Sequence, residues 1–506
     1  MTLAFNTLKL IAATLAIGLP LGTLLGLLIA RTDLPMRRFS AAALGLLLVL
    51  PLYLQAAAWQ LGFGIFGWYT LAFGNAFDAA WLSGWRGAIF VHSIAAIPWI
   101  ALFTGLSARS VEPQIEEAAL LDAPAWQVFR TITLPRIWPA LALASLWVSL
   151  LVATDMTVTD LFQVRTYAEE VYTDFAAPQD IQSTQSGPWI GVLIVGGLVA
   201  VAILFCTAAA RTSTRLLPKR DRRFAIHAWR WPLAVLVWIC LFVMLGMPLV
   251  SLVYKAGVVV QPATDGVVRS WSAPKCFEIV AASVPNYHRE FGWSAFIATG
   301  AASLAFVIAL PLAWFARRGG AKTFPAVFAA ALSLAIPAPL LAIGLIHVLN
   351  SPHLPWINWF YQSSATPMLG QTVRALPLPV FICWFAFRSI PEQHFEAAAI
   401  DGAGELAQFF EVAIPQRKGM FLGAWLAAFV AAFNELPATL LLEAPGRTTL
   451  PVAIYQLMHG SGEDRLAGIV LMSVLGYAGI GTIVLIAQKI RIFRASKREF
   501  LHTGNH

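Results

Sequence analysis

Residues 117–123 read Glu-Ala-Ala-Leu-Leu-Asp-Ala, and residues 396–402 read Glu-Ala-Ala-Ala-Ile-Asp-Gly. Each stretch leads into a segment that ends in a hydrophobic residue and a proline. These prolines, Pro135 and Pro415, stand 18 and 19 residues after the glutamates. A pattern that recurs in the same order predicts a chain built from two related halves.

The composition around these stretches is that of a membrane protein. Apolar residues make up 58% of the 506 residues and charged residues 12%, against about 45–50% and about 25% in soluble domains. The mean hydropathy is +0.71. So few charges cannot cover the surface of a soluble protein, so we expect lipid to be the main solvent.

A transmembrane helix needs about 20 mostly apolar residues. Eleven segments meet this need, so we predict an all-α membrane protein with about eleven transmembrane helices. The segments are 8–30, 41–63, 88–106, 138–154, 189–209, 232–254, 293–316, 324–349, 367–387, 420–442 and 466–488.

Positive charges predict the orientation of these helices. If the helices alternate in direction, 24 of the 34 lysines and arginines fall on one side, which is the cytoplasmic side. The linker 210–231 and the C-terminus are then cytoplasmic, and the N-terminus is external. This distribution also accounts for the net charge of +8 without a nucleic-acid partner.

The two motif copies each lie between the third and the fourth helix of a five-helix set, on the same side of the membrane. The repeat is therefore parallel, with one extra helix between the sets. We predict a first transmembrane domain at 4–209, a cytoplasmic linker at 210–231, and an extra helix with an external loop at 232–289. A second transmembrane domain at 290–488 and a cytoplasmic tail at 489–506 complete the chain.

An acidic residue follows each motif-ending proline by 20 residues, Asp155 in the first half and Glu435 in the second. Each is expected to end the helix that follows the loop. Acids at membrane depth are costly and usually line a cavity or pair with a partner. Two interpretations stay open, a place in a translocation pathway and a solvated place at the outer interface.

The two loops resemble the EAA signature of permease subunits of binding-protein-dependent ABC importers. The second copy has the full form with Gly402, whereas Ala123 and Pro124 replace the glycine in the first. The resemblance implies a type I permease core in each half, with two short helices and a turn that dock on an ATPase. The implied docking residues are Glu117, Ala118, Ala119, Asp122 and Ala123, and Glu396, Ala397, Ala398, Asp401 and Gly402.

Two further stretches, 434–442 and 164–172, look like segments of fused permeases of the ferric-iron import family. The resemblance implies ferric iron as the cargo, with thiamine, phosphonate or another small solute as alternatives. Asp155 and Glu435, with the neighbouring Asn434, are possible pathway residues. Such permeases usually carry one more helix before the first half, so we expect a shortened N-terminus or a misplaced start.

The sequence contains no Gly-x-x-x-x-Gly-Lys-Ser/Thr loop and no His/Cys cluster with metal-ligand spacing. We therefore expect no enzymatic activity, no cofactor and no metal site in this chain. The expected partners are two copies of a cytoplasmic ABC ATPase, an external or periplasmic substrate-binding protein and membrane lipid, in a bacterial inner membrane. The rival classes are an ion-coupled secondary transporter and a membrane scaffold.

Overall fold

The computed structural model describes residues 2–73, 80–111, 113–176, 196–198, 201, 224–263, 266–350, 357–460 and 462–503. The first part of the chain forms α1 (Thr2–Arg31), α2 (Arg37–Val49), α3 (Leu52–Phe63), α4 (Trp68–Phe73), α5 (Gly84–Ser110), α6 (Pro113–Asp122), α7 (Ala125–Val128), the π-helical turn η1 (Phe129–Thr133), α8 (Leu134–Thr154), α9 (Thr157–Leu161) and α10 (Tyr167–Ala176). The middle part forms η2 (His227–Trp229), α12 (Arg230–Leu241), η3 (Phe242–Gly246), α13 (Met247–Gly257), β1 (Val258–Ala263), β2 (Gly266–Trp271) and α14 (Ala273–Asn286). The last part forms α15 (His288–Ala316), η4 (Gly320–Thr323), α16 (Phe324–Ala335), α17 (Ala338–Leu349), α18 (Asn358–Tyr361), α19 (Ala365–Ala375), α20 (Pro377–Arg388), α21 (Glu392–Ile400), α22 (Glu405–Ala407), the π-helical turn η5 (Gln408–Ala413), α23 (Ile414–Phe433), α24 (Pro437–Leu441), α25 (Leu450–His459) and α26 (Glu463–Thr503).

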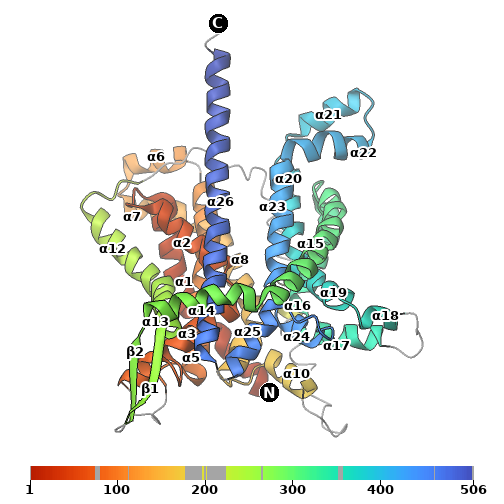
Figure 1. Cartoon of the computed structure of the whole chain (residues 1–506). Coiled ribbons are helices and arrows are strands. Elements are labelled where there is room, and N and C mark those ends of the chain that lie inside the picture. Colours follow the sequence, from red (N-terminus) through yellow and green to blue (C-terminus); the bar gives the residue numbers. More distant parts are fainter. Residues whose placement is uncertain are drawn as a thin grey trace.

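The long helices form one bundle with two distinct ends (Figure 1). The short helices α6 and α21 project at one end, where α26 also rises beyond the bundle. The N-terminus and the β1–β2 hairpin lie at the other end. The structure therefore places both motif copies and the C-terminal helix on the same side, as the charge distribution predicted.

Six helical stretches in the described part of the chain are long and apolar enough to cross a membrane, and three bent pairs could add one span each. Together they coincide with nine of the eleven expected segments. Segment 189–209 lies almost entirely outside the described residues, as does most of the linker 210–231. Segment 420–442 is divided between α23 and the short α24.

Three expected spans are not single straight helices. The pairs α2–α3, α16–α17 and α19–α20 bend by 102°, 98° and 48°. Pro51 and Pro337 stand at the two sharp bends, and proline cannot donate the hydrogen bond that would continue a helix. Polar side chains replace the missing donors: Gln55 donates to two freed carbonyl oxygens at 2.9 and 3.2 Å, and Arg374 donates to two at 3.3 Å.

The long helices approach closely because small residues line their contacts. On α1, a Cβ added to Gly22 would lie 2.7 Å from the Cβ of Ile100 on α5, and one added to Gly26 would lie 2.7 Å from the carbonyl oxygen of Ala101. On α15 the fully buried face is instead made of alanine. Its members are Ala298, Ala301, Ala302, Ala305, Ala309, Ala313 and Ala316.

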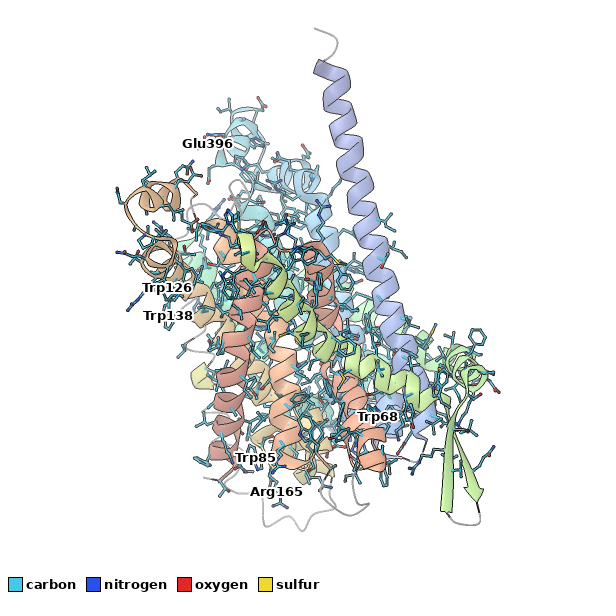
Figure 2. All side chains as sticks on the ribbon, turned by 90° about the vertical axis from the view of Figure 1, so that its left-hand side faces the viewer. Trp68, Trp85, Trp126, Trp138, Arg165 and Glu396 are labelled. Carbon is cyan, nitrogen blue, oxygen red and sulfur yellow. The ribbon has the colours of Figure 1, made fainter. Side chains whose placement is uncertain are left out.

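Tryptophans lie toward both ends of the bundle. Trp126 and Trp138 lie toward the end with the projecting helices, and Trp68 and Trp85 toward the opposite end (Figure 2). Trp138 exposes 66% of its surface. Aromatic residues gather at the two membrane–water interfaces, so this distribution fits a bundle that spans the bilayer along its long axis.

The all-α prediction was wrong at one place. Residues 258–271, expected as plain external loop, form an antiparallel hairpin in which Val260 pairs with Arg269. The valine-rich strands have high β propensity, but each is too short to give a clear alternation in the sequence. The amphipathic helix α14 follows the hairpin and packs against α13 and α26.

Candidate functional site

Two projections leave the bundle at the end where α26 emerges (Figure 1). In each, a short helix (α6 or α21) is joined by a turn to a second short helix (α7 or α22). A π-helical turn, η1 or η5, then leads directly into a long helix, α8 or α23. The structure thus forms the pair of short helices that the sequence predicted in both halves.

Most of the predicted docking residues lie on the surface of these projections. The exposed ones are Glu117, Ala118, Asp122, Glu396, Ala397, Asp401 and Gly402, whereas Ala119, Ala123 and Ala398 are half-buried. Figure 2 shows Glu396 at the outer edge of its projection. Each motif glutamate is the fifth residue of its helix and does not stand at the helix start, because α6 begins at Pro113 and α21 at Glu392. A helix dipole acts mainly within the first turn, so it contributes little at these positions.

Exposed apolar side chains occupy corresponding positions on the two projections. Leu121 and Ile400, each four residues after the motif glutamate, are 87% and 86% exposed. Trp126 and Leu406, each nine residues before the motif-ending proline, are 71% and 76% exposed. Exposed apolar side chains that gather beside charged residues are typical of protein contact surfaces. Sequence reasoning missed these four residues, although their equal spacing in the two copies was visible.

The turns of the two projections use different chemistry. Gly402 has a φ of 84°, in the left-handed region that favours glycine, and its amide donates to the carbonyl oxygen of Ala399 at 3.0 Å. In the first copy Ala123 still bonds back into α6, and Pro124 accepts a hydrogen bond from the amide of Val128 at 3.1 Å. Proline therefore starts the second helix in one copy, and glycine ends the first helix in the other.

Comparison with known proteins agrees with this geometry. Residues 305–497 match the family model of the inner-membrane component of binding-protein-dependent transport systems. A putative ABC transporter permease of Streptomyces antibioticus is 32% identical over 171 residues, which cover 33% of this chain and 72% of that protein. The chain belongs to the ABC transporter permeases.

Two further relatives of the permease differ in how much they cover. A probable ABC transporter permease of Sinorhizobium fredii is 24% identical over 512 residues, which cover 97% of the permease and 88% of that protein. The trehalose/maltose transport system permease MalG of Thermococcus litoralis is 31% identical over 137 residues, which cover 27% of the permease and 48% of MalG. The permease is therefore a multi-pass component of an ABC importer and not an enzyme, and its family works with separate ATPase subunits and a substrate-binding protein.

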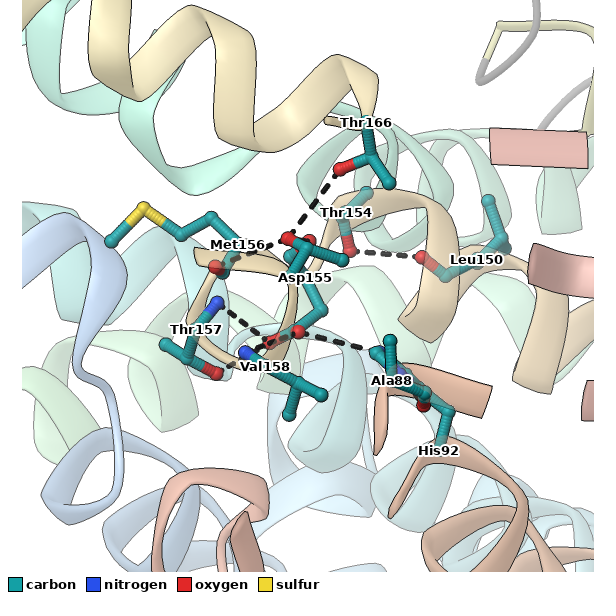
Figure 3. Close-up of polar contacts among 10 residues, drawn as sticks. Ala88, His92, Leu150, Thr154, Asp155, Met156, Thr157, Val158 and Thr166 are labelled. Carbon is teal, nitrogen blue, oxygen red and sulfur yellow. Dashed lines mark hydrogen bonds and ion pairs between the residues drawn. The ribbon is translucent and has the colours of Figure 1, made fainter. Parts of the chain in front are cut away.

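Asp155 stands directly after α8 and caps the short helix α9 (Figure 3). Its carboxylate accepts hydrogen bonds from the hydroxyl of Thr157 at 2.7 Å and from the amide of Val158 at 3.0 Å. His92 on α5 places Nε2 3.3 Å from Oδ2 of Asp155, and its Nδ1 lies 2.8 Å from the carbonyl oxygen of Ala88. Since that carbonyl only accepts, Nδ1 is the donor in this contact.

Glu435 has the corresponding place after α23. It accepts a hydrogen bond from the amide of Ala438 at the start of α24, at 3.0 Å. Its other oxygen lies 3.8 Å from Nε of Arg374, the residue that supports the α16–α17 bend. The neighbouring Asn434 bonds to Tyr477 and donates to the carbonyl oxygen of Val49 at 3.1 Å. The structure therefore gives all three proposed pathway residues defined hydrogen-bond partners, and Asn434 connects the second half to the first.

A polar contact near the N-terminal end of the bundle also joins the two halves. Asp160 on α9 accepts a hydrogen bond from the hydroxyl of Tyr455 on α25 at 2.5 Å. Nε2 of His459 lies 3.2 Å from the same oxygen. The hydrogen bond between His459 and Asp160 raises the pKa of His459. Burial acts to raise the pKa of Asp160, but hydrogen bonds from His459 and Tyr455 hold it below its usual value. No motif or spacing indicates a contact between residues that lie 295 positions apart.

Among the described residues, no group of three or more His, Cys, Asp or Glu side chains is placed to hold a metal ion. The polar side chains of the bundle instead cap helices, support bends and join the halves.

Proposed function

We propose that the permease forms both halves of the translocation pathway of an ATP-driven importer in the bacterial inner membrane. Two transmembrane domains, at 4–209 and 290–488, are joined by a linker at 210–231 and an extra helix with an external hairpin at 232–289. Residues 489–506 form the tail. The element order from α15 to α24 follows that from α1 to α9, and one relative aligns with 97% of the chain, which supports a single fused subunit.

The observation that carries this proposal is the matched pair of exposed apolar surfaces. Leu121 with Trp126, and Ile400 with Leu406, present similar side chains at the same end of one chain. Each surface is flanked by exposed acidic residues of its motif. We infer that each projection docks one ATPase subunit, so that a single permease chain holds two copies.

ATP-driven closure of the two ATPase subunits would draw the projections together. Because η1 continues into α8 and η5 into α23, movement of a projection passes directly into a long helix of its half. The α9–α25 contact at the other end would part as the cytoplasmic ends close. A loaded binding protein would dock at that external end, on the side of the hairpin.

For the cargo we propose ferric iron, on the resemblance of residues 434–442 and 164–172. Thiamine and phosphonate are the alternatives that the same resemblance allows, and trehalose or maltose is the cargo named for the Thermococcus litoralis relative. Uptake of labelled ferric iron that depends on the binding protein encoded alongside would support iron. Uptake of a labelled sugar, thiamine or phosphonate instead would reassign the cargo and leave the importer proposal standing.

The importer proposal is tested by placing charge on both docking surfaces. The double variant Leu121→Asp/Ile400→Asp should lose both ATPase co-purification and uptake, since a charge replaces the apolar contact. Both side chains are almost fully exposed, so folding should be unaffected. The matched control is Gln114→Asp/Gln393→Asp, which adds the same charge at exposed positions three residues before each motif glutamate. Normal ATPase binding by the Leu121/Ile400 variant would reject the proposal.

A further inference from the structure

We propose that Glu116 is a positioning residue that fixes the first projection to helix α1. Arg31 is the last residue of α1, and its guanidinium forms an ion pair with the carboxylate of Glu116 on α6. The second carboxylate oxygen accepts a hydrogen bond from the hydroxyl of Thr133 at 2.8 Å. The side chain of Glu116 is fully buried and that of Arg31 is 6% exposed.

One carboxylate therefore holds three elements together. Arg31 belongs to α1, Glu116 to the first short helix of the projection, and Thr133 to the π-helical turn that runs into α8. Arg31 also donates to the carbonyl oxygen of Ala108 near the end of α5, at 3.0 Å. Removing only one partner of a buried ion pair strongly destabilises the folded protein. The projection therefore cannot shift against α1 and α8 without breaking this contact.

The burial of Glu116 separates its role from docking. It precedes the motif glutamate Glu117, which lies on the exposed side of the same helix. Glu116 points into the bundle and cannot touch an ATPase, whereas Glu117 is placed at the surface. Two consecutive glutamates thus face opposite sides, one for the partner and one for the permease's own helices. This inference rests on the proposed function, in which the projection docks an ATPase.

We call the contact between Arg31 and the first projection the joint of the first half. The second half has an arginine at the corresponding place. Arg317 follows the last residue of α15, as Arg31 ends α1. Phe395 stands before the motif glutamate where the first half has Glu116. The Arg317 guanidinium lies 3.8 Å from the ring centre of Trp314 and 4.7 Å from that of Phe395. An aromatic partner therefore replaces the carboxylate at the corresponding place.

The end of the linker between the halves also meets the first joint. The amide of Phe224 donates to the carbonyl oxygen of Arg31 at 2.8 Å, and its carbonyl oxygen accepts from the amide of Asp33 at 3.3 Å. The ring of Phe224 lies 5.1 Å from the Arg31 guanidinium. Movement of the first projection is therefore passed to the segment that enters α12 as well as to α1 and α8.

The test compares transport with ATP hydrolysis in the reconstituted importer. Glu116→Ala should still co-purify with the ATPase within about two-fold of the wild type, because the docking surface is untouched. Uptake per ATP hydrolysed should fall at least about ten-fold, because the projection moves without carrying its helices. Glu116→Gln keeps the size and the hydrogen bond to Thr133 but not the charge. Its uptake per ATP hydrolysed should lie between that of the wild type and that of Glu116→Ala. It also serves if Glu116→Ala does not fold.

Hydrogen exchange gives a second readout that is independent of transport. The amides of residues 113–122 should exchange faster in Glu116→Gln, while those of 392–400 stay unchanged. Unchanged uptake per ATP together with unchanged exchange would overturn the proposal. Loss of ATPase co-purification in Glu116→Gln would also overturn it, since Glu116 would then act in docking. Failure of the wild type to bind an ATPase would reject the proposed function instead.

Discussion

The two halves of the permease hold their projections by different chemistry. In the first half a buried carboxylate, Glu116, bridges Arg31 and Thr133. In the second half Arg317 lies on the rings of Trp314 and Phe395. An ion pair depends on two charges and fails when either is lost, whereas ring contacts distribute the same support over several apolar side chains. The two joints therefore occupy corresponding places, but different substitutions disrupt them.

The same difference recurs at other corresponding positions. Thr133 in the first half is matched by Ala413 in the second, both two residues before the motif-ending proline. Asp160, which contacts α25 of the other half, is matched by Leu440; they stand five residues after Asp155 and Glu435. The first half is therefore expected to respond to changes of charge and pH, and the second to changes of side-chain volume.

The largest effect is expected where the halves are alike, at the motif glutamates. A charge-assisted contact contributes about 1.5–3 kcal/mol, so Glu117→Lys or Glu396→Lys should each weaken docking by roughly ten- to a hundred-fold. The double variant should abolish ATPase pull-down and uptake while the permease stays folded. Gln114→Lys/Gln393→Lys is the control for added charge. Normal uptake in the double glutamate variant would remove these loops from the coupling path.

The next effect separates the two turns. Gly402→Pro should cripple transport, because proline fixes φ near about −65° and Gly402 has a φ of 84°. Ala123→Gly should be nearly silent, since this copy turns through Pro124. Uptake by both variants at equal membrane levels is the measurement. Full transport by Gly402→Pro would show that the turn geometry of the second projection is unimportant.

One substitution in each joint sharpens the comparison. Glu116→Gln leaves Arg31 buried without its counter-charge and should destabilise the permease by about 3–5 kcal/mol. Phe395→Leu removes one ring from the Arg317 site and should cost about 1–2 kcal/mol. Chemical unfolding of both variants in the same detergent measures the difference. Equal losses would contradict the contrast between an ionic and an aromatic joint.

The smallest effect is a pH dependence of the α9–α25 contact. The raised pKa of His459 means that its charge is fully present below about pH 6.5 and is lost as pH rises through the raised pKa. The lowered pKa of Asp160 means that its charge is present above about pH 4 and is lost only in stronger acid. Tyr172 and Glu169 also face this site, and burial raises the pKa of Glu169.

The difference in Tm between the wild type and Asp160→Asn should therefore be greatest between about pH 4 and 6.5 and shrink by pH 8. Leu440→Asn, at the corresponding position of the second half, should show no such trend. A Tm difference that grows with pH would contradict the assignment of a charged His459.

Local sequence signals predicted the two projections and the turn at Gly402, because these depend on short spacings and on one residue's φ. They did not show that Glu116 is buried and Glu117 exposed, because only packing decides which face of a short helix meets the bundle. They also missed the bends at Pro51 and Pro337, where a continuous apolar run conceals a break. Gln55 and Arg374 donate hydrogen bonds to the carbonyl oxygens freed at those breaks, and these contacts form only in the folded chain.

We propose that one permease chain carries two complete docking surfaces. Native mass spectrometry of the complex purified through the permease tests it directly. The result expected is one 54.9 kDa permease with two ATPase subunits, falling to one ATPase when either Leu121→Asp or Ile400→Asp is introduced. A complex with one ATPase per permease chain in the wild type, or two permease chains sharing two ATPases, would contradict it.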